Sequence, residues 1–224
     1  MLNMKLEVIR EREREQKMTA QIHFKPIVSK MYCSPSQVVL AVRRRPLVVY
    51  GGGIVVSDCG QKVVFKVDGC GTLGRRGEVI LRDGDGDALL LIRRKEGIVE
   101  ALNIHRHWRG YTSDYEGSRK LVFSLKEPNS CLVKDNPIRI STQPRGCGTV
   151  WDFEIKGDFP GRACCIVDSK GNIIAQVAVK KEIEQLMMTG KDFYHVVVKP
   201  GIDQAFVFGV IAVLDYIYDG STRC

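Results

Sequence analysis

No run of 18 apolar residues occurs in this 224-residue sequence, so no segment predicts a transmembrane helix. The first 20 residues contain REREREQK instead of a basic start followed by an apolar run, and they predict no secretory signal. An apolar run of ten residues, AFVFGVIAVL, lies near the C-terminus at residues 205–214. A segment this short and this apolar is expected to lie inside a fold, because it falls well short of a bilayer span.

The eight cysteines include no C-x-x-C pair, which weighs against a zinc site, and no metal site is predicted. Cys164 and Cys165 are adjacent, so their side chains would face opposite ways in a strand. Because no secretory signal is found, we expect reduced thiols in the cytosol or nucleus. The simplest interpretation is that the cysteines are small buried hydrophobic side chains.

Acidic residues are few in the first half of the chain. Residues 1–112 hold 20 Lys and Arg against 12 Asp and Glu, whereas residues 113–224 hold 14 of each. The whole net charge of +8 therefore belongs to the first half, which favours an anionic partner, either nucleic acid or a lipid surface. Aromatic residues are only 8% of the chain, and most fall inside expected strands instead of alternating with basic residues. Nucleic acid is therefore the less favoured of the two partners.

Short apolar runs rich in Val and Ile, bounded by Gly, Asp, Asn and Pro, dominate the chain after residue 37. Runs of this length and composition are typical of strands. They lie at residues 38–42, 46–50, 63–67, 79–81, 89–93, 121–126, 153–156, 163–168, 173–179 and 194–199. So many strands with so few helical patterns predict a β-barrel or a β-sandwich.

Three segments share one layout: VVSDCGQKVVFKV, ILRDGDGDALLLI and IVDSKGNIIAQVA. Each has an apolar strand end, a turn that contains Asp, and a second strand, with Gly60, Gly86 or Gly171 in the turn. Asp and Gly accept the positive φ that a tight turn requires. The repeat therefore predicts three hairpins of a meandering antiparallel sheet.

Two segments favour a helix. Residues 180–188, KKEIEQLMM, are mostly helix formers and are followed by Gly190, a natural helix breaker. Residues 205–218 follow Asp203, which can cap a helix N-terminus, and would make about four turns. The β-branched content of the second segment leaves a strand open on propensity alone. If it is a helix that is apolar all round, it must be surrounded on all sides, which in a mostly β protein places it inside a barrel.

From about residue 31 to residue 218 the sequence resembles the plant LURP-one-related family. The resemblance is strongest in DFEIKGDFPGRACCIVDSKGNIIAQVAVKKEI and in GKDFYHVVVKPGIDQAFVFGVIAVLDYIY. These segments contain a strand ending in Lys-Gly, an Arg-x-Cys strand, an Asp-x-x-Gly hairpin and a Pro-Gly-x-Asp-x-Ala-Phe entry to a final apolar helix. VFKVDG, LIRRK and HWRGY match the earlier half. Gly209 inside the helix and the Gly-rich stretch DGCGTLGRRGE depart from the family pattern.

The resemblance implies a mainly β fold, a closed twelve-stranded antiparallel β-barrel of the tubby C-terminal-like type that encloses a C-terminal hydrophobic helix. One barrel domain is expected over residues 25–220, with a charged leader over 1–24 and a tail over 221–224. The central helix would bury Ala205, Phe206, Phe208, Val210, Ile211, Val213 and Leu214.

The resemblance implies less about function. By fold, family members look like relatives of tubby proteins and phospholipid scramblases, and one branch is associated with basal defence against oomycete pathogens. No family-wide enzymatic activity or ligand is established. We therefore expect a non-enzymatic, monomeric adaptor in plant defence or stress response, with no cofactor and with protein partners still to be found. The expected location is the cytoplasm, and the nucleus or the periphery of the plasma membrane are the alternatives.

Several motifs fail a structural test. GCGTLG fits a dinucleotide-binding string, but RRGEVILRD follows it and predicts a turn and a strand where a helix is needed. DGDGD resembles the start of a calcium loop, but Ala88 and Arg94 occupy the positions where that loop needs Gly and Glu. His105 and His107 would share one face of a strand, but no third metal ligand lies nearby in sequence.

The basic clusters are the candidate functional residues. On a strand, Arg93 and Lys95 would face the same way and Arg94 the opposite way. A solvated barrel rim explains the clusters without a function, whereas the functional interpretation is a patch for anionic lipid, which tubby relatives bind as phosphoinositide through basic barrel residues. A nucleic-acid-associated regulator and a small-ligand barrel or enzyme stay open as alternatives. The candidate residues are Arg75, Arg76, Arg93, Arg94, Lys95, Arg106 and Arg109.

Overall fold

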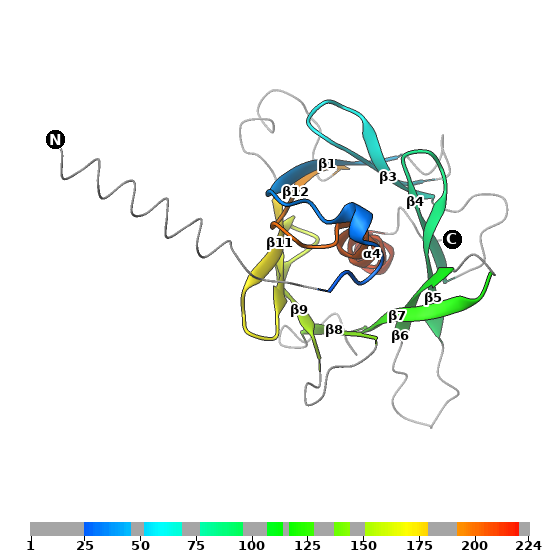
Figure 1. Ribbon diagram of the computed structural model, residues 1–224. Coiled ribbons are helices and arrows are strands. Elements are labelled where there is room, and N and C mark those ends of the chain that lie inside the picture. Colours follow the sequence, from blue (N-terminus) through cyan, green and yellow to red (C-terminus); the bar gives the residue numbers. More distant parts are fainter. Residues whose placement is uncertain are drawn as a thin grey trace.

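The structure is a computed structural model that describes residues 25–45, 52–68, 77–95, 107–113, 117–127, 137–143, 151–178 and 192–219. Within these residues twelve strands form one closed antiparallel barrel around a helix, which Figure 1 shows in a view along the barrel. This architecture confirms the fold that the family resemblance implies. The strands are β1 (Val38–Arg44), β2 (Gly53–Ser57), β3 (Val63–Asp68), β4 (Glu78–Asp83), β5 (Ala88–Lys95), β6 (His107–Ser113), β7 (Arg119–Lys126), β8 (Ile138–Thr142), β9 (Phe153–Asp158), β10 (Ala163–Asp168), β11 (Ile173–Ala178) and β12 (Phe193–Val198). The helical elements are η1 (Lys30–Tyr32), α4 (Gln204–Leu214) and η3 (Asp215–Asp219).

The barrel closes between its first and last strands. Consecutive strands are neighbours throughout, and β1 pairs with both β2 and β12, with Val39 opposite Val197. Inward side chains are buried and outward ones are more exposed, as in β1, where Leu40 and Val42 are buried and Arg43 is exposed. The closure of these twelve described strands leaves none of them with an unpaired edge on which another chain could add a strand.

The three repeated segments are hairpins, as the sequence predicts, and they join β2 to β3, β4 to β5 and β10 to β11. In each turn one oxygen of the leading aspartate accepts the backbone amides two and four residues later. For Asp58 these are Gly60 and Lys62, each at 2.9 Å. Asp83 and Asp168 accept the same two positions at 2.8–3.1 Å. The aspartate therefore closes the turn, which explains why it recurs at this position.

The positive φ angles of these turns lie three residues after the aspartate. Gly86 and Gly171 hold that position with φ of 105° and 87°. In the first turn the position belongs to Gln61, with φ of 64°. The expectation that Gly60 takes the positive φ is therefore wrong, because Gly60 stands one residue too early in the turn.

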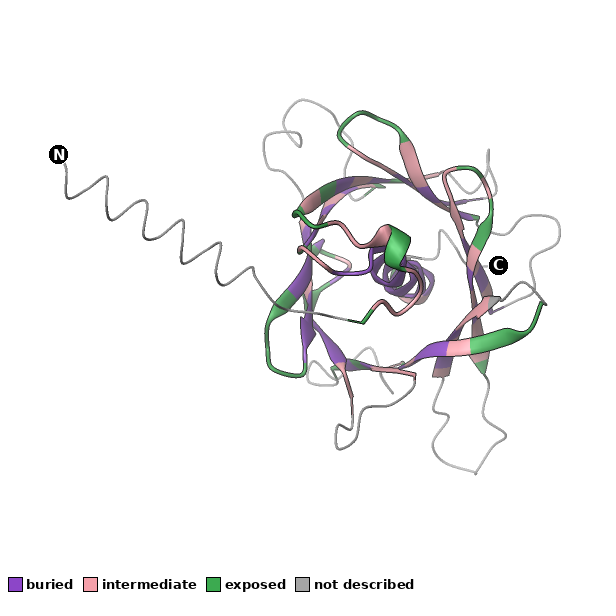
Figure 2. Cartoon of the chain, in the orientation of Figure 1, coloured by how far each residue is buried: buried purple, intermediate pink, exposed green. Residues whose placement is uncertain are grey.

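α4 fills the barrel, and all its residues are buried, as the purple helix at the centre of Figure 2 shows. The side chain of Asp203 caps it by accepting a hydrogen bond from the amide of Phe206 at 3.3 Å. The expected helix over 205–218 is confirmed, but its last part, η3, has π-helical geometry. Seven residues of α4 expected in the core are indeed buried: Ala205, Phe206, Phe208, Val210, Ile211, Val213 and Leu214.

Two glycines allow close packing inside the barrel. A Cβ added at Gly209 of α4 would lie 2.9 Å from Cδ1 of Leu90, so the glycine lets α4 approach β5. A Cβ added at Gly110 of β6 would overlap the ring of Phe123 on the neighbouring strand. The Phe123 ring in turn meets Phe206 of α4 edge-on, with ring centroids 5.6 Å apart.

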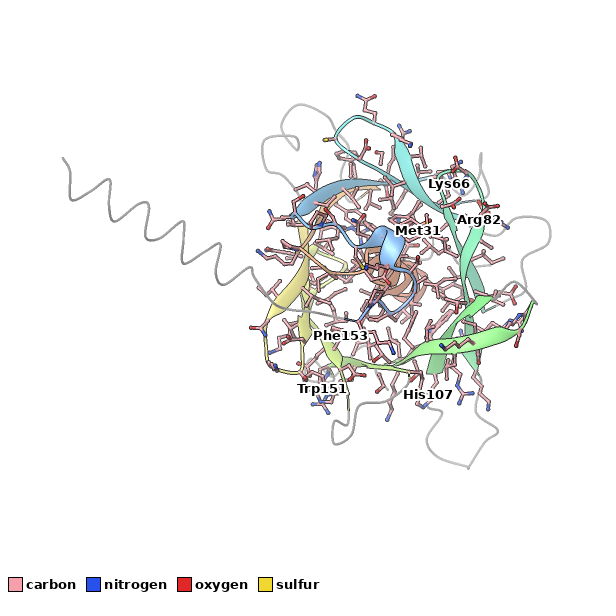
Figure 3. All side chains as sticks on the ribbon, viewed as in Figure 1. Met31, Lys66, Arg82, His107, Trp151 and Phe153 are labelled. Carbon is pink, nitrogen blue, oxygen red and sulfur yellow. The ribbon has the colours of Figure 1, made fainter. Side chains whose placement is uncertain are left out.

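Residues 25–37, which we call the strap, cross the end of the barrel where α4 begins (Figure 1). The second carboxylate oxygen of Asp203 accepts the backbone amides of Ile27, Val28 and Ser29 at 3.1, 2.7 and 2.9 Å. Met31 lies over the end of α4 in Figure 3 and is 87% exposed. One buried carboxylate therefore caps the helix and fixes the strap.

The other end of α4 is held by a buried ion pair. Arg44 points inward from the last position of β1, and its Nε lies 3.1 Å from Oδ1 of the fully buried Asp215. The same guanidinium reaches the exposed Asp192 at 2.9 Å. A positive charge here also opposes the negative end of the helix dipole.

Some expectations have other outcomes. The expected strand over 46–50, the helix over 180–188, the leader over 1–24 and the tail over 221–224 lie outside the described residues.

Four cysteines are described, and all four are free. Cys164 is buried and Cys165 is half-buried, which confirms that the two face opposite ways in β10. Cys59 is exposed in a hairpin turn, so the expectation of uniformly buried cysteines is wrong. In the part of the chain that the structure describes, no helix is long and apolar enough to cross a membrane.

Candidate anion-binding face

Five basic side chains gather on the outer surface of β5, β6 and β7. In the register of these strands Lys95 is opposite His107, and His107 is opposite Lys126. One row further along, Arg93 is opposite Arg109. The inward residues between them, among them the fully buried Ile92, Trp108 and Leu125, fix the outward direction of the basic ones. We call this set the basic face: Arg93, Lys95, His107, Arg109 and Lys126.

The basic face sits at the end of the barrel where α4 ends. Neighbouring strands are antiparallel and β1 starts beside the strap, so the odd-numbered strands β5 and β7 run away from the strap. Lys95 and Lys126 are the last residues of those two strands. Figure 3 shows His107 on the outer side of the barrel, away from α4.

The charges of the basic face are only partly compensated. Nε of Arg93 donates to Oε2 of Glu78 at 2.7 Å, with the two side chains 38% and 17% exposed. For Lys95, Arg109 and Lys126 the described residues provide no ion-pair partner. Like charges directly opposite each other across a strand pair are destabilising, so the Arg93–Arg109 pair favours binding of an anion.

The structure separates the predicted basic residues into three groups. It brings Arg93, Lys95 and Arg109 together on the basic face. Arg94 faces the barrel interior, where its Cβ would lie 3.2 Å from a Cβ added at Gly77, so it does not share that face. Arg75, Arg76 and Arg106 lie outside the described residues.

Sequence reasoning did not select His107 and Lys126 as members of the face. Lys126 stands alone between an apolar strand and an acidic residue, so no local cluster marks it. Only the register, which places Lys126 opposite His107, joins Lys126 to the other members of the face, 17 to 33 positions earlier in the chain. The signal was the strand alternation of LVFSLK, which predicts an outward Lys126 once the inward Leu125 is assigned.

Trp108 connects the basic face to the barrel core. Its Nε1 donates to Oε1 of Glu127 at 2.7 Å, and its ring packs edge-on against Tyr216 of η3 at 4.8 Å between centroids. The hydroxyl of Tyr216 accepts the amide of Gly77 at 3.2 Å. β6 is therefore tied to the end of the central helix directly beneath the basic face, which holds the backbone of that face in place.

The DGDGD segment has a structural role. Oδ1 of Asp83 accepts the amides of Asp85, Gly86 and Asp87 at 2.8–3.1 Å, so its charge is used to close the β4–β5 turn. No group of three or more His, Cys, Asp or Glu side chains that could hold a metal ion occurs within the described ranges.

Comparison with known proteins agrees with the barrel and its central helix. The family model described as LURP-one-related matches residues 38–215, from the first strand to the end of α4. The chain belongs to the LURP-one-related family. Protein LURP-one-related 6 of Arabidopsis thaliana is 56% identical to this LURP-one-related chain over 201 residues, which cover 89% of the chain and 100% of the relative. Protein LURP-one-related 16 of the same plant is 52% identical over 205 residues, covering 89% and 95%.

More distant relatives of this LURP-one-related chain extend the comparison. Protein LURP1 of Arabidopsis thaliana is 25% identical and covers 84% of the chain and 87% of its own length. A solved X-ray structure of an Arabidopsis thaliana protein superposes with a TM-score of 0.60 at 22% identity, covering 85% of this chain and 97% of that one. This likeness supports the barrel fold alone. The names of these relatives are family names and state no enzymatic activity.

Proposed function

We propose that this LURP-one-related protein is a non-catalytic binding module that holds an anionic phospholipid surface through its basic face. It acts there as an adaptor in a plant defence or stress response. The observation that carries the proposal is the direct pairing of Arg93 with Arg109, of which only Arg93 has a carboxylate partner among the described residues. Clustered Lys and Arg near an anionic membrane contribute about 1 kcal/mol each to binding.

The position of the charges also supports a surface contact. Lys95 and Lys126 are exposed at the ends of β5 and β7, the two strands that flank β6, so they can meet a flat surface together with Arg93 and Arg109 in the next row. The interior of the barrel is occupied by α4, which favours a module that works through its outer surface over one that encloses a ligand.

The test is co-sedimentation with phosphatidylcholine vesicles that contain phosphatidylserine or a phosphoinositide, at low and at physiological salt. The variant Arg109→Gln/Lys126→Gln removes two charges that have no ion-pair partner in the described residues, and should lose about 2 kcal/mol, or about 30-fold in affinity. The matched control is Arg119→Gln/Lys120→Gln, which makes the same charge change on exposed residues at the opposite end of β7.

Binding that survives physiological salt, falls in the first variant and persists in the control supports the proposal. Equal loss in both variants would mean that only total charge matters, and the specific face would be rejected. No binding to any vesicle, together with steeply salt-dependent binding to DNA, would move the assignment to a nucleic-acid-associated regulator.

A further inference from the structure

A row of large apolar side chains crosses the outer surface of β4, β5, β6 and β7 beside the basic face. Ile80 of β4 is opposite Leu91 of β5. Leu91 is in turn opposite Tyr111 of β6, and Tyr111 is opposite Leu121 of β7. We call these four residues the apolar band. Neighbouring strands lie about 4.8 Å apart, so the band is about 14 Å long.

The apolar band faces away from the barrel core. In β5 the flanking residues Leu90 and Ile92 are at most 1% exposed, so Leu91 points outward. The same alternation holds around Ile80 in β4. All four band residues are half-buried, and none belongs to the half-buried apolar residues that pack against the core. Each therefore packs against its neighbours in the row and keeps part of its surface in solvent.

A β-bulge brings the last member of the band to the outer surface. The register of β6 and β7 shifts between Gly110, which is opposite Phe123, and Tyr111, which is opposite Leu121. The shift leaves Val122 without a pairing residue on β6, and Val122 is 4% exposed. Without the bulge Val122 would be opposite Tyr111 and Leu121 would face inward. The bulge therefore turns Leu121 outward, an adjustment that is common beside functional sites.

The apolar band and the basic face are parallel rows of one surface. Arg93 and Arg109 lie two residues from Leu91 and Tyr111 on the same faces of β5 and β6, which is about 7 Å nearer the end of the barrel where α4 ends. Only Glu78 adds an acid to that row, and its carboxylate is paired with Arg93 at 2.7 Å. Apolar side chains beside a row of cations match the interface of an anionic bilayer, where phosphates adjoin hydrocarbon.

We infer that the apolar band enters the lipid interface when the basic face binds an anionic membrane. The basic side chains then lie at the phosphates, and the band lies at the boundary between head groups and acyl chains. Tyr111 suits this depth, because its ring is apolar and its hydroxyl is polar. The inference rests on the proposed function and makes it more specific, since the contact with the bilayer is apolar as well as electrostatic.

Leu91→Thr/Leu121→Thr tests the apolar contribution. Threonine is a good strand former, and neither leucine packs against the core, so the variant should fold. On vesicles of phosphatidylcholine and phosphatidylserine at physiological salt it should bind about tenfold more weakly, the effect of burying about 60 Å² less apolar surface at about 25 cal/mol per Å². Its dependence on salt should match that of the wild type, because no charge is changed, whereas Arg109→Gln/Lys126→Gln should weaken that dependence.

The matched control is Val39→Thr. Val39 is an outward residue of β1, 42% exposed and five strands away from β6 around the closed barrel. It loses apolar character in the same way on another side of the molecule, so the Val39→Thr protein should bind vesicles like the wild type.

Leu91→Trp measures insertion without weakening the contact. On vesicles whose lipids carry bromine near the top of the acyl chains, the added fluorescence should be quenched and should shift to shorter wavelength. Subtraction of the wild-type signal removes the contribution of the native tryptophans, of which Trp108 is fully buried. Val39→Trp should show neither quenching nor a shift.

The outcomes separate this inference from the membrane proposal. Wild-type affinity of Leu91→Thr/Leu121→Thr, or absence of quenching in a vesicle-bound Leu91→Trp protein, would overturn the inference and leave membrane binding by the basic face standing. A wild-type protein that binds no vesicle would overturn both. A protein that is dimeric without lipid and monomeric as Leu91→Thr/Leu121→Thr would assign the band to a second copy of the chain and also overturn the inference.

Discussion

The carboxylate of Asp203 accepts a hydrogen bond of 2.7 Å from the backbone amide of Val28, across 175 positions of sequence. The same carboxylate caps α4 and also accepts the amides of Ile27 and Ser29. Four amides on two separate elements therefore depend on one side chain. Removal of the Asp203 carboxylate would leave these amide donors without an acceptor. A buried donor without an acceptor costs more free energy than the loss of both partners of a hydrogen bond.

Asp203→Ala is expected to lower the free energy of unfolding by about 3 kcal/mol or more, because a cap and three further charged hydrogen bonds are lost. Asp203→Asn keeps one acceptor oxygen and should lose less. Urea denaturation measures both, with Asp85→Ala, a change at an exposed turn residue, as the control. Limited proteolysis with trypsin should cut after Lys30 in both Asp203 variants before the barrel unfolds, whereas Lys25 precedes Pro26 and is not a tryptic site. A strap that stays protected would show that other contacts hold it.

Gly209→Asp and Ala212→Asp should each prevent folding. Both positions lie on the fully buried α4, so either substitution places an unpaired charge in the barrel core. Near-UV circular dichroism and thermal unfolding measure the effect. Ala88→Asp, the same change at an exposed strand end, should fold normally. A folded Ala212→Asp protein with an unchanged melting temperature would contradict the central helix.

Gly110→Ala should destabilise the barrel by about 1–3 kcal/mol, because the new methyl group overlaps the buried ring of Phe123. The ring cannot move away easily, since Phe206 of α4 packs against it. In a protein that already carries Phe123→Leu, Gly110→Ala should lower the free energy of unfolding much less. Additive losses in the double-mutant cycle would show that the two residues do not compete for space.

Gln61→Gly should stabilise the protein by up to about 1 kcal/mol, because Gln61 holds a left-handed conformation that costs a side chain about that much. The reciprocal change Gly171→Ala should destabilise by a similar amount. A Cβ at Gly171 meets nothing within 4 Å, so the loss there reflects backbone conformation alone. Thermal unfolding of both variants tests the pair, and equal signs for the two shifts would reject the explanation.

Cys164 should resist alkylation in the folded protein at pH 8, whereas Cys59 should react. Burial, followed by the neighbouring Cys165, raises the pKa of the Cys164 thiol to about 12 from an ordinary 9.0. Because the folded-state pKa is the higher one, the Cys164 contribution to stability is complete below pH 9 and is lost as the pH rises towards 12. Cys164→Ala should reduce the fall in stability over that range, as measured by urea denaturation at pH 8 and pH 10.

The sequence predicts correctly those elements whose structure depends on residues close together in the chain. The aspartate-led turns, the alternation of β5 and β10, and the capped apolar helix depend on neighbours a few residues apart. β6 and β8 were not predicted as strands, and β2 was predicted only as the leading strand of a hairpin. β6 contains Gly110 and a histidine and an arginine among few apolar residues, so its strand signal is weak.

The functional surfaces are less visible in the sequence because they depend on register. Arg94 looks equivalent to Arg93 and Lys95 in the string LIRRK, yet alternation turns it into the barrel. Arg44 looks like one of three surface arginines, but it pairs with the buried Asp215, 171 positions later.

α4 follows all twelve strands along the chain, and this order constrains how the protein can be made. The ribosome synthesises all twelve strands before the helix that fills the barrel. β1 cannot pair with β12 until nearly two hundred residues have emerged. Throughout that time the nascent chain carries apolar faces and open strand edges, the features that chaperones bind and that promote aggregation. Folding is therefore completed only after α4 has emerged, and a ribosome that stalls before α4 would release an unfilled, aggregation-prone sheet.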